Sequence, residues 1–306
     1  MVLEPAENPE AASRSDPAIE PIALPVETVV VVGVGLIGAS VGLALRARWP
    51  GVSVVGVGRS EQTRRDAVSS GAVERCASVL GDALDGLDAS RTAVVVAVPV
   101  GSVVRVLEEL RGWGGLVTDA GSSKAEIVAA ARDLPWFVGA HPMAGGEQKG
   151  PLAGKPDLFV GRPCVVTPHA GNGPEAVGGA RALWEAVGCR VVEMSAEEHD
   201  RAVAAVSHLP HAAACLLISV VRELGGWPVA STGLRDTTRV ASSNPPMRAD
   251  IMISNRGPLL EALREYRGHL DELIGDLEAG DHASLLAGLE KIKATRDGWL
   301  DGVKEL

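Results

Sequence analysis

A glycine-rich turn between an apolar run and a helical pattern constrains the fold of this chain more than any other feature. The β-branched run Thr28–Val32 leads into Gly33, Gly35 and Gly38, spaced as GxGxxG, and a helical pattern follows over Leu36–Arg48. In this context the three glycines permit a tight turn, the approach of a pyrophosphate and close helix packing. The pattern predicts a dinucleotide-binding unit, and the alternative is a fold that keeps the turn but has lost its cofactor.

The cofactor contacts expected here come from the start of the helix. The backbone amides of Leu36 and Ile37 have no partner within the helix and would face phosphate groups. About 20 residues onward, where an acid would hold the adenosine ribose of NAD, the chain has Arg59 and Ser60, and the first acid is Glu61. Arg59 and Ser60 suit a 2′-phosphate, which indicates NADP or the use of both NAD and NADP. Equally, Arg59 could stack on adenine or lie in solvent.

Strand-like and helical patterns alternate from residue 27 to residue 195. The apolar runs are Thr28–Gly33, Val52–Val57, Thr92–Val98, Leu116–Asp119, Trp136–Ala140, Cys164–Thr167 and Arg190–Met194. The segments between them carry apolar residues at helical spacing. This alternation predicts an α/β domain of the Rossmann type, a doubly wound sheet of parallel strands joined by right-handed crossovers, which the last two runs could extend.

Beyond Ser195 the strand patterns stop and long amphipathic stretches follow. These helical stretches are 196–224, 246–279 and 281–305. The part between 202 and 221 is rich in Ala, Val and Leu, and is too apolar for the surface of a small monomeric bundle. We therefore predict an all-helical C-terminal dimerisation domain and a homodimer.

We expect the chain to have three parts. These are a flexible tail rich in proline and acids (1–26), a dinucleotide-binding domain (27–195) and a helical substrate and dimerisation domain (196–306). The net charge of −10, without a basic run, argues against nucleic acid as a partner. Four scattered cysteines and the lack of a signal-peptide pattern favour a cytoplasmic protein. Polar residues interrupt the most apolar stretch, so we expect no membrane insertion.

Two of the expected strands end in polar motifs. DAGSSK, which contains Ser122, follows the run ending at Asp119, and HPMAGGE begins at His141. The carboxyl ends of strands in an open α/β sheet face the ligand crevice, so Ser122 and His141 would lie near a bound nicotinamide. Hydride transfer needs an acid/base partner, and an imidazole is suited to that task. The simpler readings are a helix cap for Ser122 and a strand-end hydrogen bond for His141.

The helical domain carries two further polar motifs. In SHLPH, Ser207 and His211 are four residues apart and share a helix face, and Pro210 should kink that helix. The segment GLRDTTR reads as a polar loop, and its guanidinium groups suit the capture of a carboxylate. Asp236 and Arg239 of this segment could equally form an ordinary ion pair.

We assign no chemical role to two other groups of polar residues. His208 and His211 lack a third ligand nearby, and hydride transfer needs no metal, so we expect no metal site. The cluster Glu197-Glu198-His199-Asp200 is typical of a helix start, where carboxylates complement the helix dipole.

Five motifs, VGVGLIGAS, DAGSSK, HPMAGGE, SHLPH and LRDTTRVA, together resemble the prephenate/arogenate dehydrogenase family of tyrosine biosynthesis, over residues 27–306. The resemblance implies an oxidative decarboxylation. NAD(P)+ takes hydride from ring carbon 4 of prephenate, the ring carboxylate leaves as CO2, and 4-hydroxyphenylpyruvate forms. The chain departs from the family at Met247-Arg248, where the family commonly has a tryptophan after Pro-Met.

The resemblance also implies roles for individual residues. His141 would accept the proton of the C4 hydroxyl as hydride leaves, Ser122 would orient His141 and that hydroxyl, and Arg239 would bind a substrate carboxylate. The other implied substrate contacts are Ser207, His211, Asp236 at the pocket entrance and Glu147 at its rim.

The substrate could also be arogenate or 4-amino-4-deoxyprephenate. Recognition of a side-chain ammonium should need an acid, and the loop after HPMAG offers Glu147 and then Gln148, Lys149 and Pro151. The lack of a second acid in this loop favours prephenate. Two rivals stay open: another two-domain dehydrogenase, such as a 3-hydroxy acid dehydrogenase or an imine reductase, and a catalytically silent dinucleotide-binding sensor.

Overall fold

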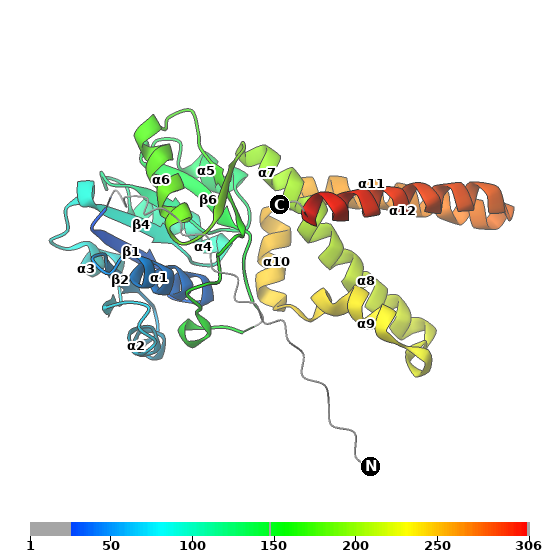
Figure 1. Ribbon diagram of the computed structural model, residues 1–306, viewed down its shortest axis with the longest axis horizontal. Coiled ribbons are helices and arrows are strands. Elements are labelled where there is room, and N and C mark those ends of the chain that lie inside the picture. The colour runs from blue at the N-terminus through cyan, green and yellow to red at the C-terminus, as the bar shows by residue number, and fades with distance from the viewer. Residues whose placement is uncertain (1–25, 147, 305–306) are drawn as a thin grey trace, which may run out of the picture.

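The computed structural model describes residues 26–146 and 148–304, and these residues form two parts that lie side by side (Figure 1). An α/β part with one sheet comes first along the chain, and a part made of helices follows. This is the predicted combination of a Rossmann-type sheet and an all-helical C-terminal domain. The predicted flexible tail, residues 1–26, lies outside the described residues except for Val26.

Eight strands form the sheet, and all but β3 coincide with the predicted apolar runs. They are β1 (Thr28–Val32), β2 (Ser53–Val57), β3 (Arg75–Ala77), β4 (Thr92–Val96), β5 (Val117–Asp119), β6 (Phe137–Pro142), β7 (Pro163–Thr167) and β8 (Arg190–Glu193). The strand β3 has only three residues, of which Arg75 is exposed, so it carries no apolar pattern that the sequence could reveal.

The strand order is β3-β2-β1-β4-β5-β6-β7-β8. Neighbouring strands run parallel, as predicted, except that β6 and β7 run antiparallel. A parallel neighbour requires a long crossover, usually through a helix. Between β6 and β7 the described chain has only the short 3-10 turn η2 (Pro151–Ala153), so the chain returns in the opposite direction. The two runs that could extend the predicted parallel sheet thus do so with a change of direction, since β7 runs antiparallel to β6 and β8 runs parallel to β7.

Helices cover both faces of the sheet (Figure 1). They are α1 (Leu36–Arg48), α2 (Glu61–Ser69), α3 (Leu80–Leu84), α4 (Val100–Glu109), α5 (Ala125–Ala130) and α6 (Pro174–Ala186). Alternate residues of β1 point to opposite faces, so Val29 and Val31 pack with α1 and α6, whereas Val30 and Val32 pack with α3, α4 and α5. All four valines are at most 5% exposed. The β-branched run is thus buried on both faces, as parallel strands require.

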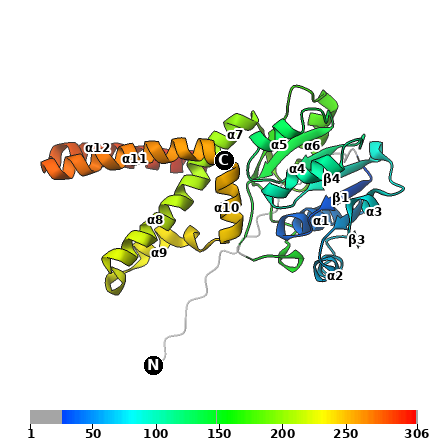
Figure 2. The same ribbon diagram turned by 180° about the vertical axis from the view of Figure 1, so that it is seen from behind.

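The second part consists of helices and short helical turns. They are α7 (Ala196–Val203), the π turn η3 (Ala204–His208), α8 (Leu209–Leu224), η4 (Trp227–Val229), α9 (Thr232–Thr238), η5 (Arg239–Ser242), α10 (Pro245–Ser254), α11 (Arg256–Ala279) and α12 (His282–Lys304). Helix α10 stands between α8 and the α/β part, where it contacts α4 (Figure 1, Figure 2). Helices α11 and α12 project together away from the sheet (Figure 2).

Two predicted features of the helical part need correction. The stretch 246–279 is two helices, because Asn255 leaves the helical conformation and its side chain donates a hydrogen bond to the carbonyl of Asp200 at 2.8 Å. The segment GLRDTTR is not a loop, since Thr232–Thr238 forms α9. A helix this short depends on packing against α8 more than on its own sequence pattern, which is why the sequence did not reveal it.

The predicted kink at Pro210 takes the form of a widened turn. The helix continues from Ala196 to Leu224, and the π turn η3 lies directly before Leu209 and Pro210. Proline has no N–H to donate, and a π turn is one way in which a helix accommodates a missing hydrogen bond. This turn carries Ser207 and His208.

Candidate active site

The glycine turn after β1 has the geometry that a dinucleotide needs. Gly33 has φ +99°, and a Cβ atom there would lie 2.6 Å from the carbonyl oxygen of Ala97. A Cβ atom on Gly38 would lie 2.1 Å from the carbonyl oxygen of Gly33, so this glycine is required for helix packing. A Cβ atom on Gly35 would meet no atom within 4 Å, so its backbone faces open space. The turn therefore fits the approach of a pyrophosphate.

The start of α1 offers the expected phosphate donors. Gly35 is its N-cap, and within the described residues no side-chain cap closes the helix start. The amides of Leu36 and Ile37 are then available to an anion. A Cβ atom on Gly146 would lie 3.3 Å from Leu36, which places the loop after His141 against this helix start.

The end of β2 is cationic. Arg59 is exposed, and the Nη1 atom of Arg64 donates to the carbonyls of Gly58 and Arg59, each at 2.9 Å. Ser60 caps α2, because its Oγ accepts from the amide of Thr63 at 3.1 Å. The sequence prediction included Arg59 and Ser60 but missed Arg64, whose contribution depends on the first turn of α2 folding back over the strand end.

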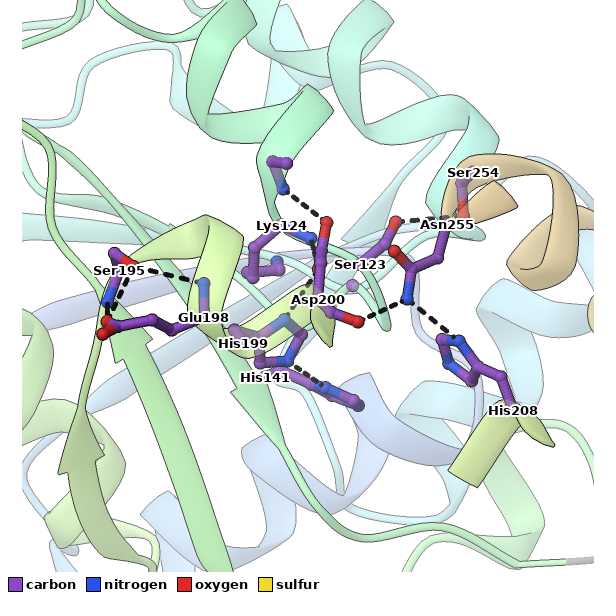
Figure 3. A network of polar contacts seen from close by, with 12 residues as sticks. Ser123, Lys124, His141, Ser195, Glu198, His199, Asp200, His208, Ser254 and Asn255 are labelled. Carbon is purple, nitrogen blue, oxygen red and sulfur yellow. Dashed lines mark hydrogen bonds and ion pairs between the residues drawn. The ribbon is translucent and has the colours of Figure 1, made fainter. Parts of the chain in front are cut away.

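His141, at the carboxyl end of β6, begins a chain of buried polar contacts (Figure 3). Its Nδ1 atom lies 2.8 Å from Nε2 of His199, and Nδ1 of His199 lies 2.8 Å from Oδ1 of Asp200. Asp200 also accepts hydrogen bonds from the amides of Lys124 at 2.7 Å and Ala125 at 2.9 Å. The contacts join β6 of the α/β part to α7 of the helical part.

The hydrogen bonds determine which ring nitrogen of His141 is free. Although burial alone would raise it, the pKa of Asp200 is held below its usual range by hydrogen bonds from His199 and two backbone amides, so this group is a carboxylate and accepts only. His199 must then donate through Nδ1 and accept through Nε2. His141 consequently donates through Nδ1, and its Nε2 atom carries a lone pair.

The environment keeps the His141 imidazole neutral. Burial is the main reason that its pKa is well below the usual value, and the positive charge of Lys124 lowers it further. A neutral imidazole with an unprotonated Nε2 can accept a proton at neutral pH. The site can therefore supply a general base.

A buried ion pair holds the backbone before His141. The Asp119 and Lys124 side chains contact each other and are both fully buried. Oδ1 of Asp119 accepts from the amide of Ala140 at 3.0 Å, and Nζ of Lys124 donates to the carbonyl of Ala140 at 2.9 Å. Burial lowers the pKa of Lys124, and the Asp119 carboxylate opposes that shift. The pair thus fixes the peptide groups from which His141 projects.

Two more contacts join α10 to the same region (Figure 3). Asn255 donates to the carbonyl of Asp200 and lies 3.1 Å from Nδ1 of His208 on the π turn. Ser123 donates to Ser254 at 3.0 Å. The strand ends, α7, the π turn and α10 therefore meet around His141.

The other predicted site residues lie outside the contacts described above. Ser122 follows β5, next to β6, but its hydroxyl makes no hydrogen bond to His141 within the described residues, and it does not cap α5. Ser207 is half-buried on the π turn, and His211 is buried on α8. Glu147 lies outside the described residues.

The two residues predicted from GLRDTTR are exposed. Asp236 pairs with Arg235 at 3.0 Å, so the ion pair considered from the sequence forms with a different arginine. Arg239 begins η5, which packs against α8, and it has no ion pair within the described ranges. Neither residue forms a hydrogen bond or an ion pair with His141 among the described residues.

The sequence analysis did not identify His199, which contacts His141, or Asp200, which contacts His199. A capping box between Ser195 and Glu198 confirms the predicted helix start. His199 and Asp200, however, lie on the buried face of α7 with Ala196 and Val203. The spacing 196, 199, 200 and 203 is that of a helix face, and two polar residues on an otherwise apolar face are the signal that could have revealed them.

Comparison with known proteins covers both parts of the chain. The family model for the nucleotide-binding domain of prephenate dehydrogenase matches residues 41–193, and that for its dimerization domain matches residues 195–291. Prephenate dehydrogenase of Bacillus subtilis is 33% identical over 89% of this chain and 76% of its own length.

Solved structures agree with these matches. Prephenate dehydrogenase of A. aeolicus, in a complex with hydroxyphenyl propionate and NAD+, superposes with a TM-score of 0.84 at 27% identity, covering 90% of this chain and 99% of that one. Arogenate dehydrogenase of Synechocystis superposes with a TM-score of 0.77 at 31% identity, covering 89% and 99%.

Proposed function

Because the chain belongs to the prephenate dehydrogenase family, as its five motifs predicted, we propose that it converts prephenate to 4-hydroxyphenylpyruvate with NAD+ or NADP+. Membership makes it an oxidoreductase that uses a pyridine nucleotide. The observation that carries the proposal is the contact of His141 Nδ1 with His199, which leaves Nε2 of His141 as an acceptor at the strand edge that also holds the dinucleotide turn.

His141 acts as the general base in this proposal. The bound nicotinamide supplies the acceptor for the hydride on ring carbon 4. Nε2 of His141 accepts the proton of the C4 hydroxyl as the hydride leaves. The bond from the ring to its carboxylate then breaks to release CO2, and the electrons of that bond complete the aromatic ring. The proton returns from His141 to the ring oxygen and gives the hydroxyl of 4-hydroxyphenylpyruvate. His199 accepts the Nδ1 proton of His141 in a hydrogen bond that strengthens as His141 becomes positive.

The substrate contacts in this proposal are those implied by the family resemblance. Ser122 stands at the neighbouring strand end and would orient the hydroxyl, and Arg239 would bind a carboxylate. The remaining proposed contacts are Ser207, His211, Asp236 and Glu147. Gly33, Gly35, Gly38 and the amides of Leu36 and Ile37 would hold the pyrophosphate.

We infer that NADP+ serves at least as well as NAD+. The end of β2 has no acid for the adenosine ribose, and the exposed Arg59 and the nearby Arg64 offer two guanidinium groups to a 2′-phosphate. Ser60 can contribute while capping α2.

A homodimer accounts for the surface of the helical part. Large apolar side chains there that are between 45% and 81% exposed include Leu216, Val220 and Leu224 on α8, Leu260, Leu270 and Leu277 on α11, and Leu289, Ile292 and Trp299 on α12. The helix Ala196–Leu224 is long and apolar enough to span a bilayer by composition, but it carries His199 and Asp200 of the buried contacts. We therefore assign its exposed apolar face to a second subunit.

We place this enzyme in the cytoplasm, with domains at 27–195 and 196–306. All four cysteines are free thiols, which suits a reducing compartment. A monomer mass by light scattering would refute the homodimer.

The function is tested by mixing the protein with prephenate or arogenate and with NAD+ or NADP+, in all four combinations, and following nicotinamide reduction by absorbance. We expect fast reduction with prephenate, and a kcat/KM for NADP+ at least equal to that for NAD+. Flat traces with intact nucleotide binding would refute the function and favour an aminated analogue or a silent sensor.

A further inference from the structure

Arg248 is a half-buried cation without an acidic partner. It lies on α10, and its Nε atom is buried with no hydrogen-bond partner in the described part of the chain. Burial lowers the pKa of this guanidinium, and only the Cys215 thiol opposes that shift. No carboxylate of the described residues forms an ion pair with it. Buried N–H groups of a guanidinium rarely lack an acceptor in proteins, so a bound ligand is expected to accept from the Nε–H of Arg248.

A second unpartnered polar atom lies close to Arg248. His211 on α8 is 5% exposed, and its Nε2 atom is buried without a hydrogen-bond partner among the described residues. Burial lowers the pKa of His211, and the charge of Arg248 lowers it further. Asn255, at the end of α10, lies 3.1 Å from Nδ1 of His208, which precedes His211 by three residues, so the two helices meet here. Two buried nitrogen atoms without partners among the described residues, one on α8 and one on α10, are therefore available to donate to an anion.

This pair borders the site around His141. Burial and the charge of Arg248 lower the pKa of His208 to about 4. Asn255, at the end of α10, lies 3.1 Å from Nδ1 of His208 and donates to the carbonyl of Asp200. The helix that carries Arg248 therefore ends among the contacts that surround His141.

We propose that Arg248, with His211, binds the carboxylate of the substrate's 2-oxo acid side chain and thereby selects prephenate over substrates that carry a side-chain ammonium. The inference rests on the proposed function. The side-chain carboxylate is the suitable one, because the ring carboxylate must lose its charge as CO2 and a cation bound to it would stabilise the ground state. A guanidinium also repels an ammonium placed beside that carboxylate.

The test compares Arg248→Gln and Arg248→Met with the parent enzyme and with Arg132→Gln, an exposed arginine beyond α5. Circular dichroism and thermal melting identify the variants that fold, and the methionine variant preserves side-chain length without charge if the glutamine variant does not fold. We expect the KM for prephenate to rise about 10- to 100-fold with kcat within about threefold of the parent. The KM for arogenate should rise less, and Arg132→Gln should match the parent.

Binding measurements separate anion recognition from a structural role. With NAD+ present, each Arg248 variant should bind 3-(4-hydroxyphenyl)propionate more weakly than the parent, while 4-ethylphenol, which has the ring but no carboxylate, should bind equally well. An unchanged KM for prephenate in a folded variant, or an equal loss of affinity for both phenols, would overturn the assignment. Absence of prephenate oxidation by the parent would instead refute the proposed function, and the binding comparison would still report on the anion site.

Discussion

The contact between His141 and His199 leads to a prediction about the rate of the chemical step. Replacing His199 with leucine removes the acceptor for Nδ1 of His141, a hydrogen bond of 2.8 Å that gains charge when His141 takes up a proton. A hydrogen bond to a charged group contributes roughly 1.5–3 kcal/mol. We therefore expect kcat to fall about 10- to 100-fold in His199→Leu, with little change in KM.

His199→Gln provides the conservative comparison. Its amide oxygen can accept from His141 while its NH2 group donates to Asp200, so the pattern of donors and acceptors is preserved. We expect this variant to recover most of the lost kcat. Glu197→Gln, at an exposed acid on the same helix, serves as the surface control.

The pH dependence tests the same contact independently. The hydrogen bond from Nδ1 of His141 to His199 favours the protonated form of His141. Loss of this acceptor in His199→Leu should move the pKa of His141 further down, so the acid limb of kcat/KM should shift to lower pH. A kcat for His199→Leu within about threefold of the parent, or a glutamine variant as slow as the leucine variant, would refute the role of this contact.

Four other variants or conditions follow from the site. His141→Asn should lower kcat by about 10²-fold or more, because it removes the general base, and near-normal steady-state turnover would contradict that role. Arg239→Gln should chiefly raise the prephenate KM, and a pure kcat effect would argue against carboxylate binding. Lys124→Met leaves the Asp119 carboxylate buried and unpaired, so denaturant unfolding should report a loss of about 3–5 kcal/mol, and a loss under ~1 kcal/mol would contradict it. His208, with its pKa of about 4 in the fold, stays neutral there while the unfolded chain takes up a proton below pH ~6.5. The free energy of unfolding should therefore fall between pH ~6.5 and ~4, by about 3 kcal/mol from this group, whereas His208→Gln should show a weaker fall.

The sheet could be predicted because its signals are local. A β-branched run such as Thr28–Val32, buried on both faces, is recognisable without knowledge of its neighbours, and the glycine turn reports its own backbone requirement. The antiparallel step at β7 and the short helix α9 could not be predicted in this way. Each depends on what lies beside it in space rather than on its own pattern.

The site was predictable only where it follows strand ends. His141 stands where the topology of an open sheet places catalytic groups. His199 is 58 residues further along the chain and comes from the other domain, so no sequence spacing relates the two. The capping box of Ser195 and Glu198 is by itself a sufficient reason for acidic residues at this helix start. The local sequence therefore did not indicate that Asp200 faces inward.

The boundary between the two domains runs through His141, the proposed general base. His141 belongs to the sheet, its partners His199 and Asp200 belong to the first helix beyond it, and Asp200 holds the amides that start α5 on the sheet side. A nucleotide-binding domain separated from its helices would therefore retain the turn for the cofactor but have a histidine without its partners. A chimaera that exchanges one domain with a relative would have to carry over both sides of this junction together.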